Sequence, residues 1–175
     1  MNVLITGIAG CGKSTVATKL KELGYESYDI ESIDGLFGMY DKDTKKPTKN
    51  YSNESLEIIK QNEWICDASK LKKLIDKNNS DKITFYCGMA SNLYELLPLF
   101  DIKVLLVADK NTTLKRLKMR TEVYEYGHTH EVQQDILSWK DNWENETLKK
   151  GLIKIDSSKP LEKVINNILS IKELE

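Results

Sequence analysis

Residues 7–15 read Gly7-Ile8-Ala9-Gly10-Cys11-Gly12-Lys13-Ser14-Thr15, which fits the pattern Gly, four residues, Gly-Lys-Ser/Thr, the Walker A motif. Glycines at these places let a tight loop bring consecutive backbone N–H groups onto a polyphosphate. The helix after such a loop points its positive N-terminal end at the same anion. The pattern therefore predicts a phosphate-binding loop, in which Lys13 reaches the β- and γ-phosphates and the Ser14 hydroxyl holds Mg²⁺.

The residues around this loop support the prediction. The preceding run, Asn2–Thr6, is short and apolar, which is typical of a buried strand. Gly24 stands where a C-terminal glycine commonly ends a helix. Apolar residues recur at helical spacing between the loop and this glycine: Val16, Ala17, Leu20 and Leu23. A strand, a glycine-rich loop and a helix in this order indicate nucleotide binding.

The composition narrows the class of protein. A chain of 175 residues is expected to form one domain, and a net charge of −1 argues against duplex nucleic acid as a partner. The cysteines, Cys11, Cys66 and Cys87, lack Cys-x-x-Cys spacing, which indicates a reducing compartment rather than a disulfide framework or a zinc site. The sequence shows neither a signal peptide nor the ~20 apolar residues of a membrane span. We expect a cytoplasmic protein, a monomer or a homodimer, that does not act at a membrane.

Acidic residues end the second predicted strand, at residues 26–31. Ligands bind at the carboxyl ends of parallel strands. Asp29 and Glu31 are two residues apart, so on a strand they would share one face. These two carboxylates can meet a metal ion or an acceptor hydroxyl group. A helix N-cap or a solvated loop is the alternative for both.

The sequence changes character between residues 33 and 62, where apolar, flexible and charged residues mix. We expect a mobile surface segment there that contacts the acceptor substrate, with a short helix near residues 54–61. A disordered excursion without a role is the alternative. Beyond it, Asp67 is a plausible cap for a helix that carries Leu71, Leu74 and Ile75, and residues 78–81 form a turn cluster.

Three further apolar runs, at residues 83–87, 102–108 and 152–156, predict strands. Helices are expected between them. Pro98 is expected to end the helix after the first of these runs, and Asp109 or Asn111 to cap the helix after the second. A further helix is indicated by a core-facing stripe of Val132, Ile136, Trp139 and Trp143. Pro160 suits the start of the last helix. Five strands that alternate with helices predict an α/β fold, a parallel sheet covered on both faces.

Only Arg116 and Arg120 are arginine among the 26 basic residues. Both are expected in the helix that Asp109 or Asn111 caps. Two arginines four residues apart, in a chain that otherwise uses lysine, indicate a place where a planar guanidinium fork is needed. A solvated helix face is the alternative. Residues 121–130 follow without an apolar period, which predicts a short lid. Metal binding by His128 and His130 is disfavoured, because no Cys or third His accompanies them.

The order of these motifs resembles that of the adenylate kinase-like small P-loop kinases, which include nucleoside monophosphate kinases and shikimate-type kinases. The resemblance spans nearly the whole chain and implies a three-layer α/β/α sandwich with a five-stranded parallel sheet. The stretches Tyr126-Gly127-His128 and Cys87-Gly88-Met89-Ala90-Ser91-Asn92 also look like motifs from a branch of uncharacterised bacterial ATP-binding proteins.

The resemblance implies roles for individual residues. Asp29-Ile30-Glu31 matches an Asp-x-Asp segment in which the first carboxylate contacts the acceptor hydroxyl and the second helps to organise Mg²⁺. Arg116 and Arg120 match arginines that clamp the transferring phosphoryl group, and Ser157-Ser158-Lys159-Pro160 matches the loop that lines the adenine of ATP. The candidate catalytic residues are then Lys13, Asp29, Arg116 and Arg120, and the candidate metal ligands are Ser14, Asp29 and Glu31.

We therefore expect phosphoryl transfer from Mg-ATP to a small acceptor. Nucleoside monophosphate and shikimate kinases place arginines on the acceptor's phosphate or carboxylate, but no arginine occurs between Ile30 and Asn92. The rings available for stacking there are Phe37, Tyr40, Trp64 and Tyr86. A nucleoside or another small hydroxyl compound fits best, and a monophosphate served by a loop lysine is the alternative.

Two alternative functions belong to other classes of protein. One is an ATPase or GTPase switch without an acceptor, and the other is an ATP-binding regulatory module. The guanine-reading Asn-Lys-x-Asp sequence of G proteins is absent from the chain.

Overall fold

Five parallel strands form the central sheet of the computed structural model, which describes residues 1–78 and 82–174. Residues 79–81 of the predicted turn therefore lie outside it. The sheet order is β2-β5-β1-β6-β7, and every neighbouring pair is parallel. The strands are β1 (Asn2–Thr6), β2 (Glu26–Asp29), β5 (Thr84–Cys87), β6 (Ile102–Val107) and β7 (Ile153–Asp156). The predicted α/β class and five-stranded parallel sheet are confirmed.

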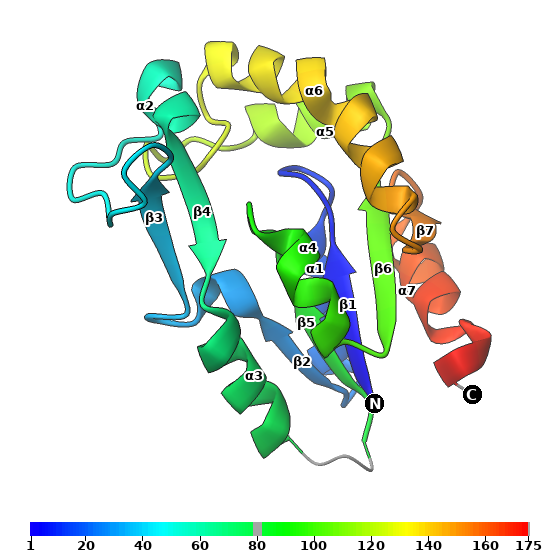
Figure 1. Ribbon diagram of the computed structural model, residues 1–175. Coiled ribbons are helices and arrows are strands. Elements are labelled where there is room, and N and C mark those ends of the chain that lie inside the picture. Colours follow the sequence, from blue (N-terminus) through cyan, green and yellow to red (C-terminus); the bar gives the residue numbers. More distant parts are fainter. Residues whose placement is uncertain (79–81, 175) are drawn as a thin grey trace.

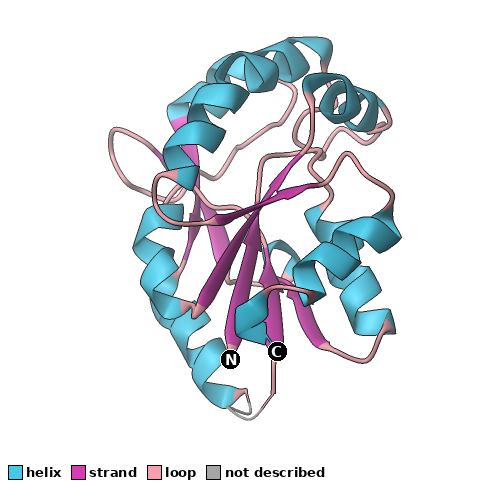
Figure 2. Cartoon of the chain, turned by 90° about the vertical axis from the view of Figure 1, so that its right-hand side faces the viewer, coloured by secondary structure: helices cyan, strands magenta, loops and turns pink. Residues whose placement is uncertain are grey.

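Helices cover both faces of this sheet (Figure 2). Because side chains alternate along a strand, Val3 and Ile5 of β1 face one layer and Leu4 faces the other. The layer over Val3 and Ile5 consists of α1 (Lys13–Glu22) and α7 (Leu161–Leu169). The opposite layer consists of α3 (Ala68–Lys77), α4 (Leu93–Leu96) and α6 (His130–Leu148).

The ends of the helices follow most of the predicted signals. The Asp67 carboxylate accepts a hydrogen bond of 3.0 Å from the backbone N–H of Lys70 at the start of α3. Asp109, rather than Asn111, caps α5 (Lys110–Lys118), because its carboxylate accepts from the Thr112 N–H at 2.8 Å. The hydrogen bonds from Thr112 lower the pKa of Asp109 to about 2. Helix α4 is followed by a single 3-10 turn, Leu97–Leu99, which contains Pro98.

Two predictions about helices were wrong. Leu23, expected on the core face of α1, lies beyond the end of that helix and is 51% exposed. Arg120 lies outside α5, which ends at Lys118, because the backbone there turns into the following loop. The stripe on α6 is confirmed for Val132 and Ile136, which are fully buried, whereas Trp139 and Trp143 are partly buried.

The segment at residues 33–62 contains more regular structure than predicted. Strand β3 (Phe37–Asp41) pairs in antiparallel register with β4 (Asn62–Cys66) and forms a hairpin separate from the main sheet (Figure 1). The expected short helix is confirmed as α2 (Leu56–Gln61). The sequence of β3, Phe-Gly-Met-Tyr-Asp, mixes residues that favour a strand with Gly and Asp, which disfavour one. Its pairing partners lie 21 to 29 positions away in the sequence, so tertiary context decides its conformation.

A small apolar cluster, here called the apical cluster, joins this segment to the rest of the fold. Its buried members are Ile8, Leu117, Val132 and Ile136, and the partly buried residues packed on it include Leu56, Ile59 and Tyr126. Leu56 and Ile59 belong to α2, while Tyr126 belongs to the predicted lid. Figure 1 shows α2 and α6 side by side above the carboxyl ends of the strands, and Lys60 of α2 pairs with Asp135 of α6 at 3.0 Å.

The cysteines Cys11, Cys66 and Cys87 are all buried free thiols, and burial raises the pKa of each. Within residues 1–78 and 82–174, no helix combines the length and apolar character needed to cross a bilayer.

Candidate active site

The phosphate loop joins β1 to α1 and packs tightly on the end of β6. Gly7 has a φ of +153°, and a side chain there would place its Cβ 2.6 Å from both Cys11 Sγ and Leu106 O. No residue with a side chain fits at this position without moving the loop. Helix α1 begins at Lys13 and has no acidic residue in its first turn, so its positive end is available to an anion.

Lys13 lies at the centre of the site. Its ammonium donates hydrogen bonds to Gly7 O at 2.9 Å and Ile8 O at 3.4 Å, and it lies 3.6 Å from Glu31 Oε1. Burial opposes the charged form, but nearby negative groups, Glu31 foremost, outweigh this effect and raise the pKa of Lys13 above its usual value. Lys13 is therefore a fixed positive charge where phosphate oxygens would bind.

Glu31 is not on a strand, contrary to the prediction, because β2 ends at Asp29 and residues Ile30–Ser32 form a 3-10 turn. This turn crosses over Gly88 at the end of β5. A Cβ at Gly88 would lie 2.5 Å from Ile30 Cγ1 and 3.3 Å from Glu31 Cγ. The missing side chain of Gly88 thus lets the turn approach, and it brings the Glu31 carboxylate to the Met89 N–H, 3.0 Å away, as well as to Lys13.

Asp29 ends β2 opposite Cys87 of β5. It occupies the N-cap position of the 3-10 turn, but its side chain makes no capping hydrogen bond. Its backbone carbonyl instead accepts from Ser32 Oγ at 2.7 Å. The negative charge of Asp29 is also among the groups that raise the pKa of Lys13. Both predicted carboxylates therefore lie near the phosphate loop, although they do not share one face of a strand.

Both arginines donate hydrogen bonds to backbone carbonyls, Arg116 to the phosphate loop and the segment after β7, and Arg120 to the predicted lid. Arg116 donates from Nη1 to Gly10 O at 3.2 Å and Cys11 O at 3.3 Å, and from Nη2 to Ser157 O at 2.8 Å. Its guanidinium group therefore links the phosphate loop to the segment after β7. Arg120 donates to the carbonyl of Tyr126 in the predicted lid. This linking role of Arg116 was not predicted from the sequence.

A cavity of about 440 Å³ extends from the phosphate loop to the segment after β7. Its lining includes residues from the loop, both arginines, and Ser157, Lys159 and Leu161. The volume falls in the range of about 300–1,000 Å³ that is usual for small-molecule sites. Ser157 is buried, and its hydroxyl has no hydrogen-bond partner in the structure. Three of the predicted elements, the loop, the arginines and residues 157–160, therefore meet at one cavity.

The donor set fits a magnesium nucleotide better than a metal ion bound by protein groups alone. In residues 1–78 and 82–174, no group of three or more His, Cys, Asp or Glu side chains is arranged to hold a metal ion. Ser14 is exposed in the first turn of α1. A cation bound there would be held by one hydroxyl and by phosphate oxygens, which is how Mg²⁺ commonly binds with a nucleotide.

The predicted lid, residues 121–130, connects α5 to α6. It is tied to the hairpin segment by Asn53, whose Nδ2 donates to Tyr124 O at 2.6 Å. It is tied to α6 by Gln133, whose Nε2 donates to Gly127 O at 3.1 Å. Burial raises the pKa of Tyr126. His128 contacts the carbonyl of Glu125 through Nδ1 at 3.0 Å.

Arg116→Lys is expected to destabilise the protein by about 2 kcal/mol. A lysine cannot contact all three carbonyls at once, and a hydrogen bond to a charged group contributes about 1.5–3 kcal/mol. The thermal midpoint should fall by about 4–8 °C. Differential scanning calorimetry checks this, with Lys115→Arg, an exposed change on the same helix, as the control. An unchanged midpoint would show that the three contacts contribute little.

Comparison with known proteins places this chain in a family. A family model described as "AAA domain" matches residues 3–136, which is most of the chain. The chain belongs to this AAA domain family. Within it, the protein is a P-loop kinase, a phosphotransferase for small substrates, as the order of the three motifs predicts.

Three of the proteins to which this AAA domain protein is similar are described as kinases. It is 27% identical to a protein described as "Probable thymidylate kinase" from Methanococcus maripaludis, over 96% of this chain and 92% of that protein. A deoxyadenosine kinase from M. mycoides with bound dATP shares the fold, with a TM-score of 0.57, 15% identity and coverage of 99% and 100% of the two chains. A gluconokinase from Sinorhizobium meliloti has a TM-score of 0.51 and 14% identity, with coverage of 97% and 89%.

Proposed function

We propose that this kinase transfers the γ-phosphoryl group of Mg-ATP to a hydroxyl group of a small acceptor that has no phosphate or carboxylate of its own, such as a nucleoside. The observation that carries this proposal is the charge distribution on the hairpin side of the site. A desolvated phosphate or carboxylate needs strong donors, usually arginine, and none occurs from residue 30 to residue 92.

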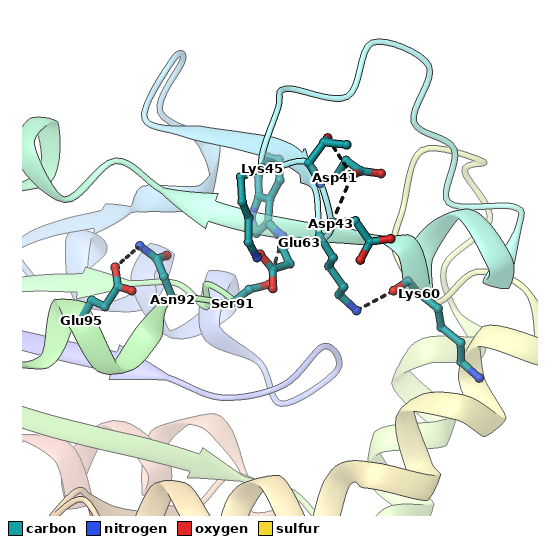
Figure 3. Close-up of polar contacts among 11 residues, drawn as sticks. Asp41, Asp43, Lys45, Lys60, Glu63, Ser91, Asn92 and Glu95 are labelled. Carbon is teal, nitrogen blue, oxygen red and sulfur yellow. Dashed lines mark hydrogen bonds and ion pairs between the residues drawn. The ribbon is translucent and has the colours of Figure 1, made fainter.

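The four lysines between β3 and α2 do not replace these arginines. Lys42, Lys45, Lys46 and Lys49 are all exposed. Lys42 donates to the carbonyl of Lys60 at 2.6 Å. Lys45 pairs with Glu63 of β4 at 3.0 Å (Figure 3). Two of the four ammonium groups are therefore already bound to groups of the same segment.

Aromatic residues of the hairpin support a flat or apolar acceptor. Phe37 of β3 and Trp64 of β4 stack with ring centroids 5.3 Å apart, and both are partly exposed. Tyr40 is also partly exposed on β3. Tyr86 does not belong to this group, contrary to the prediction. It is fully buried and stacks on Tyr28 in the core, because its strand lies inside the sheet. Stacking on Phe37, Tyr40 or Trp64 suits a nucleobase.

The geometry favours Glu31 as the group that accepts the proton of the acceptor hydroxyl. Lys13 would contact the β- and γ-phosphates, and the Glu31 carboxylate lies 3.6 Å from its ammonium group. Asp29, whose charge also acts on Lys13, is then assigned to the metal side together with Ser14. This division reverses the roles that the resemblance to shikimate-type kinases implies for Asp29 and Glu31.

The reaction requires little covalent chemistry from the protein. The acceptor oxygen forms a bond to the γ-phosphorus, the bond from that phosphorus to the β,γ-bridging oxygen breaks, and ADP leaves. The hydroxyl proton passes to Glu31. Mg²⁺, when bound, neutralises part of the phosphate charge. Lys13 and the loop amides hold the phosphates, and Arg116 and Arg120 add positive charge around the transferring group.

A direct competition tests the acceptor class. At equal concentrations, thymidine should be phosphorylated at least about tenfold faster than thymidine monophosphate, because one unpaired buried charge costs more than 1.4 kcal/mol. Chromatography of the products gives both rates from one reaction. Deoxyadenosine and its monophosphate provide a second pair with another base.

A nucleoside monophosphate kinase is the second candidate, and the relative described as "Probable thymidylate kinase" favours it. In that case thymidine monophosphate would win the competition, and a lysine of the hairpin segment would have to reach the phosphate. Lys46→Ala and Lys49→Ala, which change the two lysines other than Lys42 and Lys45, would then slow the reaction. A preference for the monophosphate would overturn our assignment of the acceptor.

ADP release with and without acceptor separates the kinase from the other two classes. A kinase releases ADP at a high rate only when an acceptor is present. A switch ATPase releases it equally without acceptor, and a regulatory module binds ATP without turnover.

A further inference from the structure

The residues after β5 connect the phosphate loop to the hairpin. The stretch from Cys87 to Asn92 resembles a motif of uncharacterised ATP-binding proteins, and its last two residues have no role in the mechanism above. Its last two residues, Ser91 and Asn92, lie beside the hairpin strands (Figure 3). They bind β4 along the edge that β3 leaves open.

Four hydrogen bonds make this connection. Ser91 donates its N–H to Trp64 O at 2.7 Å, and its hydroxyl accepts from the Trp64 N–H at 3.0 Å. Asn92 accepts from the Cys66 N–H through Oδ1 at 3.1 Å and donates from Nδ2 to Cys66 O at 3.0 Å. Both backbone groups of Trp64 and of Cys66 are therefore satisfied by the same two residues.

The chemistry of the Asn92 side chain explains its fit. A carboxamide presents one carbonyl acceptor and one N–H donor side by side, which is the pair that a neighbouring strand would offer to Cys66. Cys66 is buried, so leaving its N–H or carbonyl without a partner would be costly. Ser91 and Asn92 thus act as a short substitute for a third strand of the hairpin.

The other end of the same stretch reaches the reacting groups. Met89 donates its N–H to Glu31 at 3.0 Å, and Glu31 faces Lys13. Met89 and Ser91 are two residues apart on one backbone segment. A continuous set of contacts therefore runs from Lys13 through Glu31, Met89 and Ser91 to Trp64, which stacks on Phe37.

We propose that Ser91 and Asn92 are positioning residues for the acceptor: they fix the ring of Trp64 relative to Glu31 and so determine how tightly the acceptor binds. This inference rests on the proposed function, because it assumes that the hairpin holds the acceptor. It assigns no contact with ATP to either residue. Changes at Ser91 should therefore act on the KM for the acceptor and leave the KM for ATP unchanged.

The test compares Ser91→Ala with Ser91→Thr. Ser91 is exposed, so a threonine methyl group has room, and its hydroxyl can still accept from the Trp64 N–H. Ser91→Ala should raise the KM for thymidine about fivefold, the equivalent of one hydrogen bond of ~1 kcal/mol. Its kcat and its KM for ATP should change less than twofold, and Ser91→Thr should restore the KM for thymidine. Ser170→Ala is the matched control, since its hydroxyl donates to Asn166 O at the end of α7.

Asn92→Asp is a second, stronger variant. It keeps an oxygen for the Cys66 N–H but places a negative charge beside Cys66 O and near Glu95, whose Oε2 lies 3.4 Å from Asn92 Nδ2. The KM for thymidine should rise at least about tenfold. A rise in the KM for ATP equal to that for thymidine, or failure of Ser91→Thr to restore the wild-type value, would overturn the positioning role.

Amide hydrogen exchange separates this inference from the proposed function. The Trp64 amide should exchange faster in Ser91→Ala than in the wild type or in Ser91→Thr, with or without activity. Unchanged exchange would overturn the inference while leaving the kinase reaction untouched. If the wild type phosphorylates neither thymidine nor deoxyadenosine, the proposed acceptor class is wrong. The acceptor role of Ser91 and Asn92 is then wrong as well, whatever the Trp64 amide exchange shows.

Discussion

Lys13→Ala should lower the rate of phosphoryl transfer by about 10³-fold or more. The Lys13 side chain is only 11% exposed, and its ammonium lies in the phosphate loop between the loop carbonyls and Glu31. Removing one preorganised charge of this kind from a phosphoryl-transfer site commonly costs 10²- to 10⁵-fold, or roughly 3–7 kcal/mol in the barrier. ADP release in the presence of thymidine measures the rate, and titration calorimetry measures the affinity for ATP.

The first control for Lys13→Ala is a measurement of whether the variant keeps its fold. Lys13 makes its hydrogen bonds to the loop and not to the sheet core, so the far-UV circular dichroism spectrum should not change. Lys19→Ala, on the same helix with an ion pair to Glu22, is the matched surface variant and should keep the wild-type rate. An unchanged rate and ATP affinity in Lys13→Ala would overturn the assignment of the phosphate site.

Glu31→Gln should lower the rate of transfer by about 10²- to 10⁴-fold, the range for a positioned acid or base. Glutamine keeps an oxygen that can accept from the Met89 N–H, so the 3-10 turn should keep its place. It loses the negative charge that would take the acceptor proton and that faces Lys13. The affinity for ATP should change by less than about tenfold, because the loop amides and Lys13 remain.

Asp29→Asn is the companion to this experiment. Asp29 lies two residues earlier, and its side chain makes no capping hydrogen bond. If Asp29 acts on the metal side, its variant should need a higher Mg²⁺ concentration for half-maximal rate. A large loss of rate in Asp29→Asn at saturating Mg²⁺, together with near wild-type transfer by Glu31→Gln, would restore the roles that the resemblance implies.

The sequence was sufficient to predict the parts of the fold that depend on local pattern. The Walker A residues, the apolar runs and the capping residues Asp67 and Asp109 each act within a few positions. The order of strands and helices then leads to a parallel sheet. The meeting of the loop, the arginines and residues 157–160 at one cavity was predictable through family resemblance.

Long-range contacts could not be predicted in this way. The hairpin pairs residues 21 to 29 positions apart, and its open edge is bound by Ser91 and Asn92, which no local pattern signals. Glu31 reaches Lys13 only because Gly88, on a different strand, leaves room for the 3-10 turn. The isolated glycine after a strand was the available signal, since such glycines often mark a close approach of backbone.

The apical cluster limits how this enzyme could be given a different acceptor. Leu56 and Ile59 come from the segment between the hairpin strands, yet they pack against the cluster that contains Ile8 of the phosphate loop and Leu117 of α5. A hairpin transplanted from another kinase would thus change the support beneath the ATP site as well. Chimaeras that retain α2 and exchange only the strands and their turn should preserve ATP binding, whereas exchange of the whole segment requires apolar residues at both α2 positions.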